Sequence, residues 1–432
     1  MSVDKDLFMY GMVAVTVVRD EAPYMKEWIE YHLLAGANHF YICDHESPDN
    51  LKEVLQPYID AGLVTYFIST VEGAPQVDAY NDAIKKYKFL CRYMAFVDCD
   101  EFIFPKSKPT ISEVLDDILK DNPQAGAVGI NWHCFGSNFQ EKADYSRGVM
   151  ERFTRRAPTE WGYGTQDGQL YGNWHIKTVS NPRKVYIEHV HGVMLFDGCY
   201  SINSDGKPIQ SLFNNVPPLA DKIIVNHYYV KSLEEAAKRR SGDAARHDAY
   251  EKVCNEVFDD GILKYRDARK QELNLTGGGG KFLEKVSALN KIDYNKNFSA
   301  LAQNLIPTFT KYVPPEFLQG KLETFLTCRA LAVYLKENLL DETTGKFFEE
   351  SALNAVYKTI TSTVLTLADV FLLIAELPNL LQLKYPVVKN IVEVCLNFIP
   401  QLKDLYRDDF YKLQNYYALE YVENLLRNFD NA

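Results

Sequence analysis

The first hundred residues alternate between short apolar runs and amphipathic segments, and this alternation limits the fold more than any other feature of the chain. The apolar runs predict strands at 12–18, 39–43, 63–69 and 94–97. Apolar residues at helical spacing fill the intervals, with Gly36 and Gly62 ending the first two helices and a third helix expected at 76–86. Strands joined by helices in this way pair in parallel with right-handed crossovers, so the sequence predicts a parallel, nucleotide-binding half of an α/β domain.

The fourth apolar run carries acidic residues to its end. Residues 93–105 are YMAFVDCDEFIFP, in which Asp98 and Asp100 follow the predicted strand and Glu101 extends the acidic group. Open α/β sheets bind ligands at this edge, and two carboxylates there suit Mg²⁺ or Mn²⁺, which can bind a diphosphate. The pattern Asp-x-Asp also occurs in solvated turns. The mutual repulsion of three acids favours the cation.

The chain changes character after this strand. Capping boxes at Thr110 and Ser232 predict helix starts, and the β-like runs between them predict an antiparallel or mixed second half of the sheet. These runs lie at 127–135, 148–156, 175–181, 184–196 and 221–230. Four consecutive glycines from Gly277 predict a flexible joint over 276–292. We therefore expect an α/β domain at 1–275 and an all-α helical domain at 293–432.

Composition excludes several classes of protein. The chain has 432 residues and a formal net charge of −11, which argues against a nucleic-acid partner. Its eight cysteines form no C-x-x-C pair, so free thiols are expected. The N-terminus lacks the basic region of a signal peptide, and the most apolar later stretch, 363–381, contains Asp369, Glu376 and Pro378. We expect a cytoplasmic protein. Peripheral attachment to the inner face of the membrane and self-association through the helical domain are both left open.

Four stretches of the chain, in order, resemble the motifs of glycosyltransferase family 92 and, more broadly, of GT-A transferases. They are VVRDEAPYMKEWIEYHLLAGANHFYICDHESPDN, MAFVDCDEFIFP, GNWHIKTVSNP and VNHYYVKSLEEAAKRRSGD, and the likeness covers about residues 12–245. The resemblance implies a GT-A fold, a nucleotide-sugar donor, a divalent cation, and transfer to an acceptor hydroxyl with inversion, and we expect the donor to be UDP-linked. The helical tail falls outside it.

Polar residues at the strand ends and in these motifs are candidates for the donor site. Arg19, Glu21 and Asp44 follow the first two strands, where base and ribose would be contacted, although Arg19 could equally form a surface ion pair. Gln76 and Asn81 are candidates for uracil or ribose contacts, with helix capping as the alternative. Asp98 and Asp100 would hold the cation. By the resemblance, Lys177 and Lys231 would contact phosphate oxygens.

By the resemblance, a histidine from the later strands would complete the cation site, and a carboxylate would accept the proton of the acceptor hydroxyl. His227 ends an apolar strand and is preferred to His191 and then His189, with a buried, hydrogen-bonded histidine as the alternative for each. The catalytic base is expected in the aromatic, glycine-rich loop at 160–167. The candidates for the base are Asp167, then Glu160, Asp144 and Glu188, and the acceptor candidates are Trp132, His133 and Trp174.

The sequence thus predicts a metal-dependent hexosyltransferase. It would move a sugar, with galactose one candidate, from a UDP-sugar to a saccharide or lipid-linked saccharide, in a setting such as bacterial surface polysaccharide or lipopolysaccharide synthesis. A metal-dependent phosphohydrolase and a noncatalytic module that binds sugar nucleotides are the alternatives. The position of the acidic pair after the fourth strand, and not the first, argues against the hydrolase.

Overall fold

The computed structural model describes residues 8–71, 73, 75–166, 168–238, 244–275, 279–290, 322–338, 342–407 and 413–429. The chain divides into two compact units. The α/β unit comprises Tyr10–Leu195 and Tyr200–Lys291, and the helical unit comprises Ile292–Ala432 together with Phe196–Cys199 and Met1–Met9.

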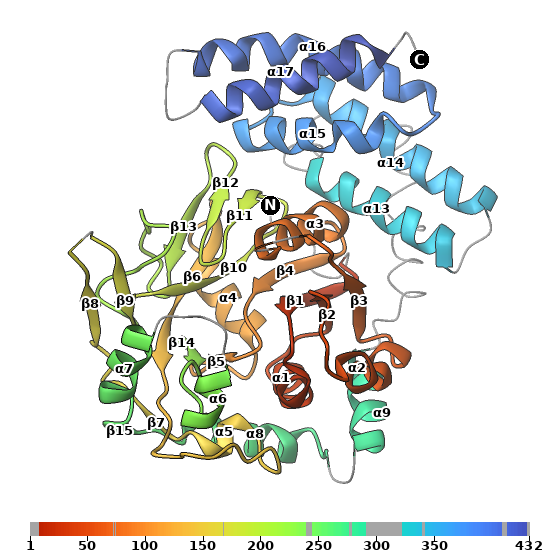
Figure 1. The fold of residues 1–432 in the computed structure, drawn as a ribbon. Helices are drawn as coiled ribbons and strands as arrows, with labels where there is room; N and C mark the ends of the chain where they lie inside the picture. The colour runs from red at the N-terminus through yellow and green to blue at the C-terminus, as the bar shows by residue number, and fades with distance from the viewer. Residues whose placement is uncertain are drawn as a thin grey trace. The chain divides into compact units, whose positions relative to one another are not determined.

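The first half of the sheet is parallel, as the alternation of strands and helices predicts. Its strands are β1 (Tyr10–Val18), β2 (His39–Asp44), β3 (Val64–Ile68) and β4 (Cys91–Phe96), in the order β3-β2-β1-β4 (Figure 1). The register pairs Val13 with His39 and with Met94. The carboxyl ends of all four strands therefore meet at one edge.

Both faces of β1 are buried because its residues alternate between two cores. Met12 and Ala14 lie in the core that also holds Trp28, while Val13 and Val15 lie in the core on the opposite face, with residues of the third helix. The helices involved are α1 (Ala22–Leu34), α2 (Leu51–Asp60) and α3 (Gln76–Tyr87), with α1 and α2 on one face and α3 on the other (Figure 1). This burial explains the continuous apolar runs in the sequence.

The second half of the sheet is mixed, as predicted. Its strands are β5 (Glu101–Pro105), β6 (Ala125–Cys134), β10 (Ile176–Ser180), β13 (Tyr200–Asn203) and β14 (Ile223–His227). Strand β10 is antiparallel to both β4 and β6, and β14 is parallel to β6. Two antiparallel steps restore the direction, so β14 runs parallel to β4. Its end at His227 therefore lies at the same edge as the end of β4.

The remaining elements of the α/β unit are short. They are α4 (Ile111–Leu119), α5 (Val149–Arg152), β7 (Arg155–Arg156), β8 (Gly162–Gly164), β9 (Leu170–Gly172), β11 (Val185–Glu188), β12 (Val193–Leu195), α6 (Leu233–Lys238), α7 (Ala244–Val253), β15 (Val257–Phe258), α8 (Gly261–Glu272) and α9 (Gly279–Asn290). The capping boxes predicted at Thr110 and Ser232 are both present.

Three local predictions were wrong. The run at 148–156 contains the short helix α5 and a strand of only two residues, β7, because the Glu27 carboxylate accepts hydrogen bonds from the N–H groups of Val149 (2.6 Å) and Met150 (3.4 Å) and caps α5. The run at 184–196 is a hairpin of β11 and β12 and not one strand, so His189 and His191 lie in its turn. The predicted joint at 276–292 is helical over α9, where Phe282 is buried.

The helical unit confirms the all-α prediction for the C-terminal part. Its described helices are α13 (Leu322–Asn338), α14 (Glu342–Ser362), α15 (Leu367–Leu380), α16 (Pro386–Tyr406) and α17 (Leu413–Arg427). A capping box of Thr366 and Asp369 begins α15. No helix in the described parts of the chain is long and apolar enough to cross a membrane. All eight cysteines are free thiols, as their spacing predicts.

Candidate functional site

The acidic turn between β4 and β5 is fixed by its own hydrogen bonds and by α1. The Trp28 indole N–H donates to the carbonyl oxygens of Asp98 (3.1 Å) and Glu101 (2.9 Å). The Glu101 carboxylate accepts from the Asp98 N–H at 2.8 Å, and the Glu101 N–H donates to the Asp98 carbonyl at 3.0 Å. These bonds therefore fix the backbone of the turn that carries Asp98 and Asp100.

Asp98 is held by three polar side chains. Its Oδ1 accepts from Gln76 (2.5 Å) and Tyr80 (3.3 Å), and its Oδ2 lies 3.0 Å from the Lys177 ammonium. Lys177 also lies 3.3 Å from Glu101, and both of these side chains are fully buried. Burial alone would lower the pKa of Lys177, but Asp98 and Glu101 raise it, so the ammonium stays charged. Lys177 thus contacts the acids directly, in place of the phosphate contact predicted for it.

His227 is the histidine that reaches the acidic turn. Its Nε2 lies 3.5 Å from Asp100 Oδ1, and the Asp100 side chain is only 2% exposed. Trp132 packs between His227 and His191, with ring centroids at 4.2 and 5.2 Å. His191 Nδ1 bonds the Ile176 carbonyl at 3.1 Å, and burial, then Lys177, hold its pKa well below the ordinary value. His227 contacts the acidic turn, whereas His191 bonds a backbone carbonyl, and the role of His227 as a cation ligand stays a prediction.

A pocket of about 440 Å³ opens at the same edge. Arg19 and Glu21 from the end of β1 line it together with Lys231 from the segment after β14. Lys231 Nζ lies 3.5 Å from Glu21 Oε2. Cys99 lies within the acidic turn, and its thiol pKa is raised first by burial and then by Glu21 and Asp100, while Lys231 opposes the rise. Charges of the pocket and charges of the acidic turn therefore both act on the Cys99 thiol.

Asp44 and Asn81, two other candidates for the sugar-nucleotide site, form hydrogen bonds within the protein. Asp44 is buried and accepts from the Ser47 N–H (2.7 Å) and the Tyr66 hydroxyl (2.5 Å). Asn81 donates to the carbonyl oxygens of Val77 (2.7 Å) and Glu188 (2.9 Å), which uses both amide hydrogens. Asp44 shapes the turn after β2, and Asn81 holds β11 against α3.

The acceptor candidates separate into buried and accessible side chains. Trp132 and His133, two of the candidates to line the acceptor site, are each only 3% exposed because β6 is a central strand, so both side chains pack within the core. Burial, with Arg156 nearby, lowers the pKa of His133 to about 3. Trp174 is half-buried beside Gly162 of β8 and remains a candidate.

The base candidates have different surroundings. Asp167 lies outside the described residues. Glu160 is exposed at the start of the β8–β9 segment. Asp144 is bonded by Ser146 and Arg147, which lower its pKa, and Glu188 is fully buried, with a pKa raised chiefly by that burial. Glu160 is therefore the one accessible and unbonded acid among the described candidates.

Open α/β sheets bind ligands at the carboxyl edge of their strands, and this sheet gathers acids, a histidine and cationic side chains beside a pocket at that edge. Sequence comparison identifies the family. Residues 13–240 match glycosyltransferase family 92, and since the match covers more than half of the chain, the protein belongs to that family. The predicted fold class and family are both confirmed.

Two relatives illustrate the likeness. The chain is 32% identical over 216 residues to a galactan β-1,4-galactosyltransferase of Arabidopsis thaliana. The match covers 44% of this chain and 41% of the relative. It is 26% identical over 148 residues to a family 92 protein of Oryza sativa subsp. japonica, covering 34% of this chain and 25% of that relative. The chain thus spans less than half the length of either relative.

Among solved structures, S. aureus TarS 1-349 in complex with UDP-GlcNAc is 11% identical to this chain. The match has a TM-score of 0.29 and covers 81% of this chain and 90% of that chain. A likeness of this size supports no detail of the site.

The pocket also contains residues that sequence reasoning missed. Tyr24, Tyr145 and Tyr229 line it, and Glu235 lies at its wall, bonded to the buried Arg152. The sequence indicates for Glu235 only the last position of the capping box that begins at Ser232. The three tyrosines are far apart in the sequence, and their spacing does not indicate that they line the same pocket.

Proposed function

We propose that this protein is a metal-dependent, inverting hexosyltransferase that moves a sugar from a UDP-sugar to a hydroxyl of a saccharide, free or lipid-linked. The meeting of Asp98, Asp100, His227 and Lys231 at one edge, beside a pocket of about 440 Å³, carries the proposal. Galactose is the first candidate sugar, because a relative is named as a galactan β-1,4-galactosyltransferase.

The side chains at Asp100 suit a divalent cation by their chemistry. Carboxylate oxygens suit Mg²⁺ and Mn²⁺, and an imidazole nitrogen in the set favours the transition metal of the two. Among the described residues no three His, Cys, Asp or Glu side chains are grouped as a ready cation site, since Asp98 contacts Lys177 and Gln76. Asp100 and His227 would hold the cation, with Asp98 beside them. When bound, it would neutralise charge on the leaving diphosphate.

The chain's own cations would bind the donor. Arg19 is exposed at the pocket, and Lys231 lines the pocket although its side chain is only 6% exposed, so both would contact diphosphate oxygens by charge-assisted hydrogen bonds. Gln76 and Lys177 would keep the Asp98 carboxylate in its orientation as the donor enters. These contacts would place the sugar at the acidic turn, next to the space left for an acceptor.

The transfer itself needs a base. Asp167, with Glu160 as the alternative, would accept the proton of the acceptor hydroxyl as its oxygen bonds to the anomeric carbon. The bond from that carbon to the diphosphate oxygen breaks, and UDP leaves with the electron pair. Attack from the side opposite the leaving group inverts the configuration. Trp174 would contribute an aromatic face to the acceptor.

A panel of UDP-sugars tests the proposal. UDP release is measured with Mn²⁺, Mg²⁺ or EDTA, with and without galactan oligosaccharides, and the linkage of any product is assigned by NMR. We expect release from UDP-galactose that depends on the cation, rises with acceptor and gives a product inverted at the anomeric carbon.

Asp100→Asn should abolish this release. The matched control is Asp116→Asn, which removes a carboxylate bonded to Arg92 (2.9 Å) and Tyr93 (2.6 Å) outside the pocket and should retain it. Release that persists in EDTA would refute the metal dependence, and a retained configuration would refute inversion. No release from any UDP-sugar would refute the proposed donor class.

A further inference from the structure

A buried ion pair of Arg152 and Glu235 lies at the wall of the pocket. The Arg152 guanidinium donates to both oxygens of the Glu235 carboxylate, at 3.0 Å to Oε1 and by a short contact to Oε2. The two side chains are 1% and 2% exposed. Removing two such charges from water is costly, and apolar residues of the same volume often stabilise a fold as well. A pair of this kind is best explained by the geometry that it imposes.

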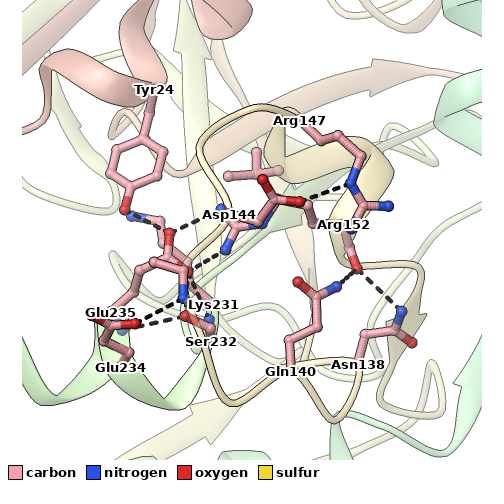
Figure 2. A network of polar contacts seen from close by, with 12 residues as sticks. Tyr24, Asn138, Gln140, Asp144, Arg147, Arg152, Lys231, Ser232, Glu234 and Glu235 are labelled. Carbon is pink, nitrogen blue, oxygen red and sulfur yellow. Dashed lines mark hydrogen bonds and ion pairs between the residues drawn. The ribbon is translucent and has the colours of Figure 1, made fainter.

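The Glu235 carboxylate collects hydrogen bonds from both sides of the pocket. Besides Arg152 it accepts from the Tyr24 hydroxyl (2.8 Å), the Ser232 hydroxyl (2.5 Å) and the Ser232 N–H (3.1 Å) (Figure 2). Burial would raise the pKa of Glu235, but the hydrogen bonds from Arg152, Ser232 and Tyr24 outweigh it and lower the pKa to about 2. Glu235 thus stays charged and joins the start of α1 to the start of α6.

Lys231 stands directly before this capping box. Its backbone has φ of +55°, a left-handed conformation that residues other than glycine seldom adopt, and the bonds at Ser232 hold the chain there. Its ammonium lies 3.9 Å from the centre of the Tyr24 ring. Its contact with Glu21, at 3.5 Å, is long for a hydrogen bond. The ammonium therefore keeps hydrogen-bonding capacity toward the pocket that it lines.

Tyr24 is oriented by the same carboxylate. Burial, and then the charge of Glu235, raise the pKa of the Tyr24 hydroxyl far above its ordinary value, so it remains a donor to Glu235. With the hydroxyl held, the ring face is fixed beneath the Lys231 ammonium. Arg152 also ties in a third segment, because its carbonyl accepts from Asn138 (3.1 Å) and Gln140 (2.5 Å) (Figure 2).

We propose that Arg152, Glu235 and Tyr24 are positioning residues that hold the Lys231 ammonium in the pocket to receive a phosphate of the nucleoside diphosphate. Arg152 fixes Glu235, Glu235 fixes the Tyr24 hydroxyl and the backbone at Ser232, and these two fix Lys231. This inference rests on the proposed donor site. It adds that the affinity of that site depends on residues that do not touch the ligand.

The test is a double-mutant cycle on UDP affinity in the full chain. UDP binding is measured by calorimetry in Mn²⁺ for wild type, Tyr24→Phe, Lys231→Met and the double variant. Lys231→Met should weaken UDP binding at least about tenfold, because it removes a charge-assisted contact. Tyr24→Phe keeps the ring but releases it from Glu235, and should weaken binding about three- to tenfold. In the Lys231→Met background Tyr24→Phe should change nothing further.

Controls separate positioning from folding. Tyr58→Phe removes a matched tyrosine hydroxyl, bonded to Glu30 at 3.1 Å outside the pocket, and should leave UDP affinity unchanged. Arg152→Lys keeps the buried charge and loses the two-point contact, so it should weaken binding in wild type and not in Lys231→Met. Additive effects of Tyr24→Phe and Lys231→Met, or no effect of Tyr24→Phe, would overturn the positioning role while the donor site stands. If wild type itself binds no UDP, the proposed function and this inference both fail.

Discussion

Replacing Lys177 by methionine should destabilise the α/β unit strongly, because Lys177 is the buried partner of two carboxylates. Glu101 is fully buried 3.3 Å from the ammonium, and removing one member of a buried pair costs about 3–5 kcal/mol. Asp98 is 34% exposed, so solvent screens its share to less than about 1 kcal/mol. We therefore expect Lys177→Met to lower the free energy of unfolding by about 3–5 kcal/mol near neutral pH.

The loss should depend on pH in a defined direction. Burial raises the pKa of the Glu101 carboxyl, and without Lys177 only the hydrogen bond from the Asp98 N–H opposes that rise. A carboxyl whose folded pKa lies above its unfolded value favours folding at low pH and loses that contribution as the pH rises through the folded pKa. The difference between Lys177→Met and wild type should therefore shrink as the pH falls from 8 towards 5. Adding Glu101→Gln to Lys177→Met should recover about 2 kcal/mol by removing the unpaired carboxyl.

Chemical denaturation followed by tryptophan fluorescence measures this unit alone, because Trp28, Trp132, Trp161 and Trp174 all lie within it. Lys106→Met is the control, since the Lys106 ammonium is exposed and bonds only the Ala220 carbonyl, and it should change stability by less than about 0.5 kcal/mol. A Lys177→Met protein within about 1 kcal/mol of wild type, or a double variant no more stable than Lys177→Met, would refute the reasoning.

Two further predictions concern buried groups away from the donor. Burial is the main cause that lowers the pKa of His32 and His39 to about 4 and of His133 to about 3. The unfolded chain binds these protons below pH 6.5 and the folded chain does not, so the contribution of these histidines to the free energy of unfolding should fall as the pH falls from 6.5 to 4. His39→Gln should change the slope of unfolding free energy against pH by about one proton, and an unchanged slope would contradict this prediction. Gly162→Ala should lower the free energy of unfolding by about 1–3 kcal/mol and weaken acceptor use, because a Cβ there would lie 2.4 Å from the Trp174 ring. Gly164→Ala is the control, since the nearest atom to its Cβ would be 3.4 Å away, and it should change neither property. Equal effects of the two substitutions would contradict this packing.

The parallel half could be predicted because each strand carries its own signal. Met12 to Val15 face two different cores, which makes the run continuously apolar, and Gly36 and Gly62 stand at the helix ends with φ of +100° and +71°. The edge that gathers Asp98 and Asp100 follows from strand direction alone. His227 could be placed there too, because it ends an apolar strand as the acids do.

The parts that could not be predicted depend on partners far apart in the sequence. The helix at 149–152 exists because Glu27, more than a hundred residues earlier, caps it, and a Cβ at Gly148 would meet the Glu27 carboxylate at 2.0 Å. Burial of Trp132 likewise depends on which strands flank β6. Lys177 lies in a motif that predicts a phosphate contact, yet its partners are Asp98 and Glu101. The pairing of β10 with β4, which the sequence does not show, brings Lys177 to these acids.

The central claim is that Asp100 and His227 hold a cation that a UDP donor requires. Calorimetric titration of UDP into wild type and Asp100→Asn, each in Mn²⁺ and in EDTA, tests it most directly. We predict that wild type binds UDP only with Mn²⁺, and that Asp100→Asn binds at least about tenfold more weakly, since it removes a charged oxygen ligand. UDP binding that is equal in Mn²⁺ and EDTA, or unchanged in Asp100→Asn, would contradict the account.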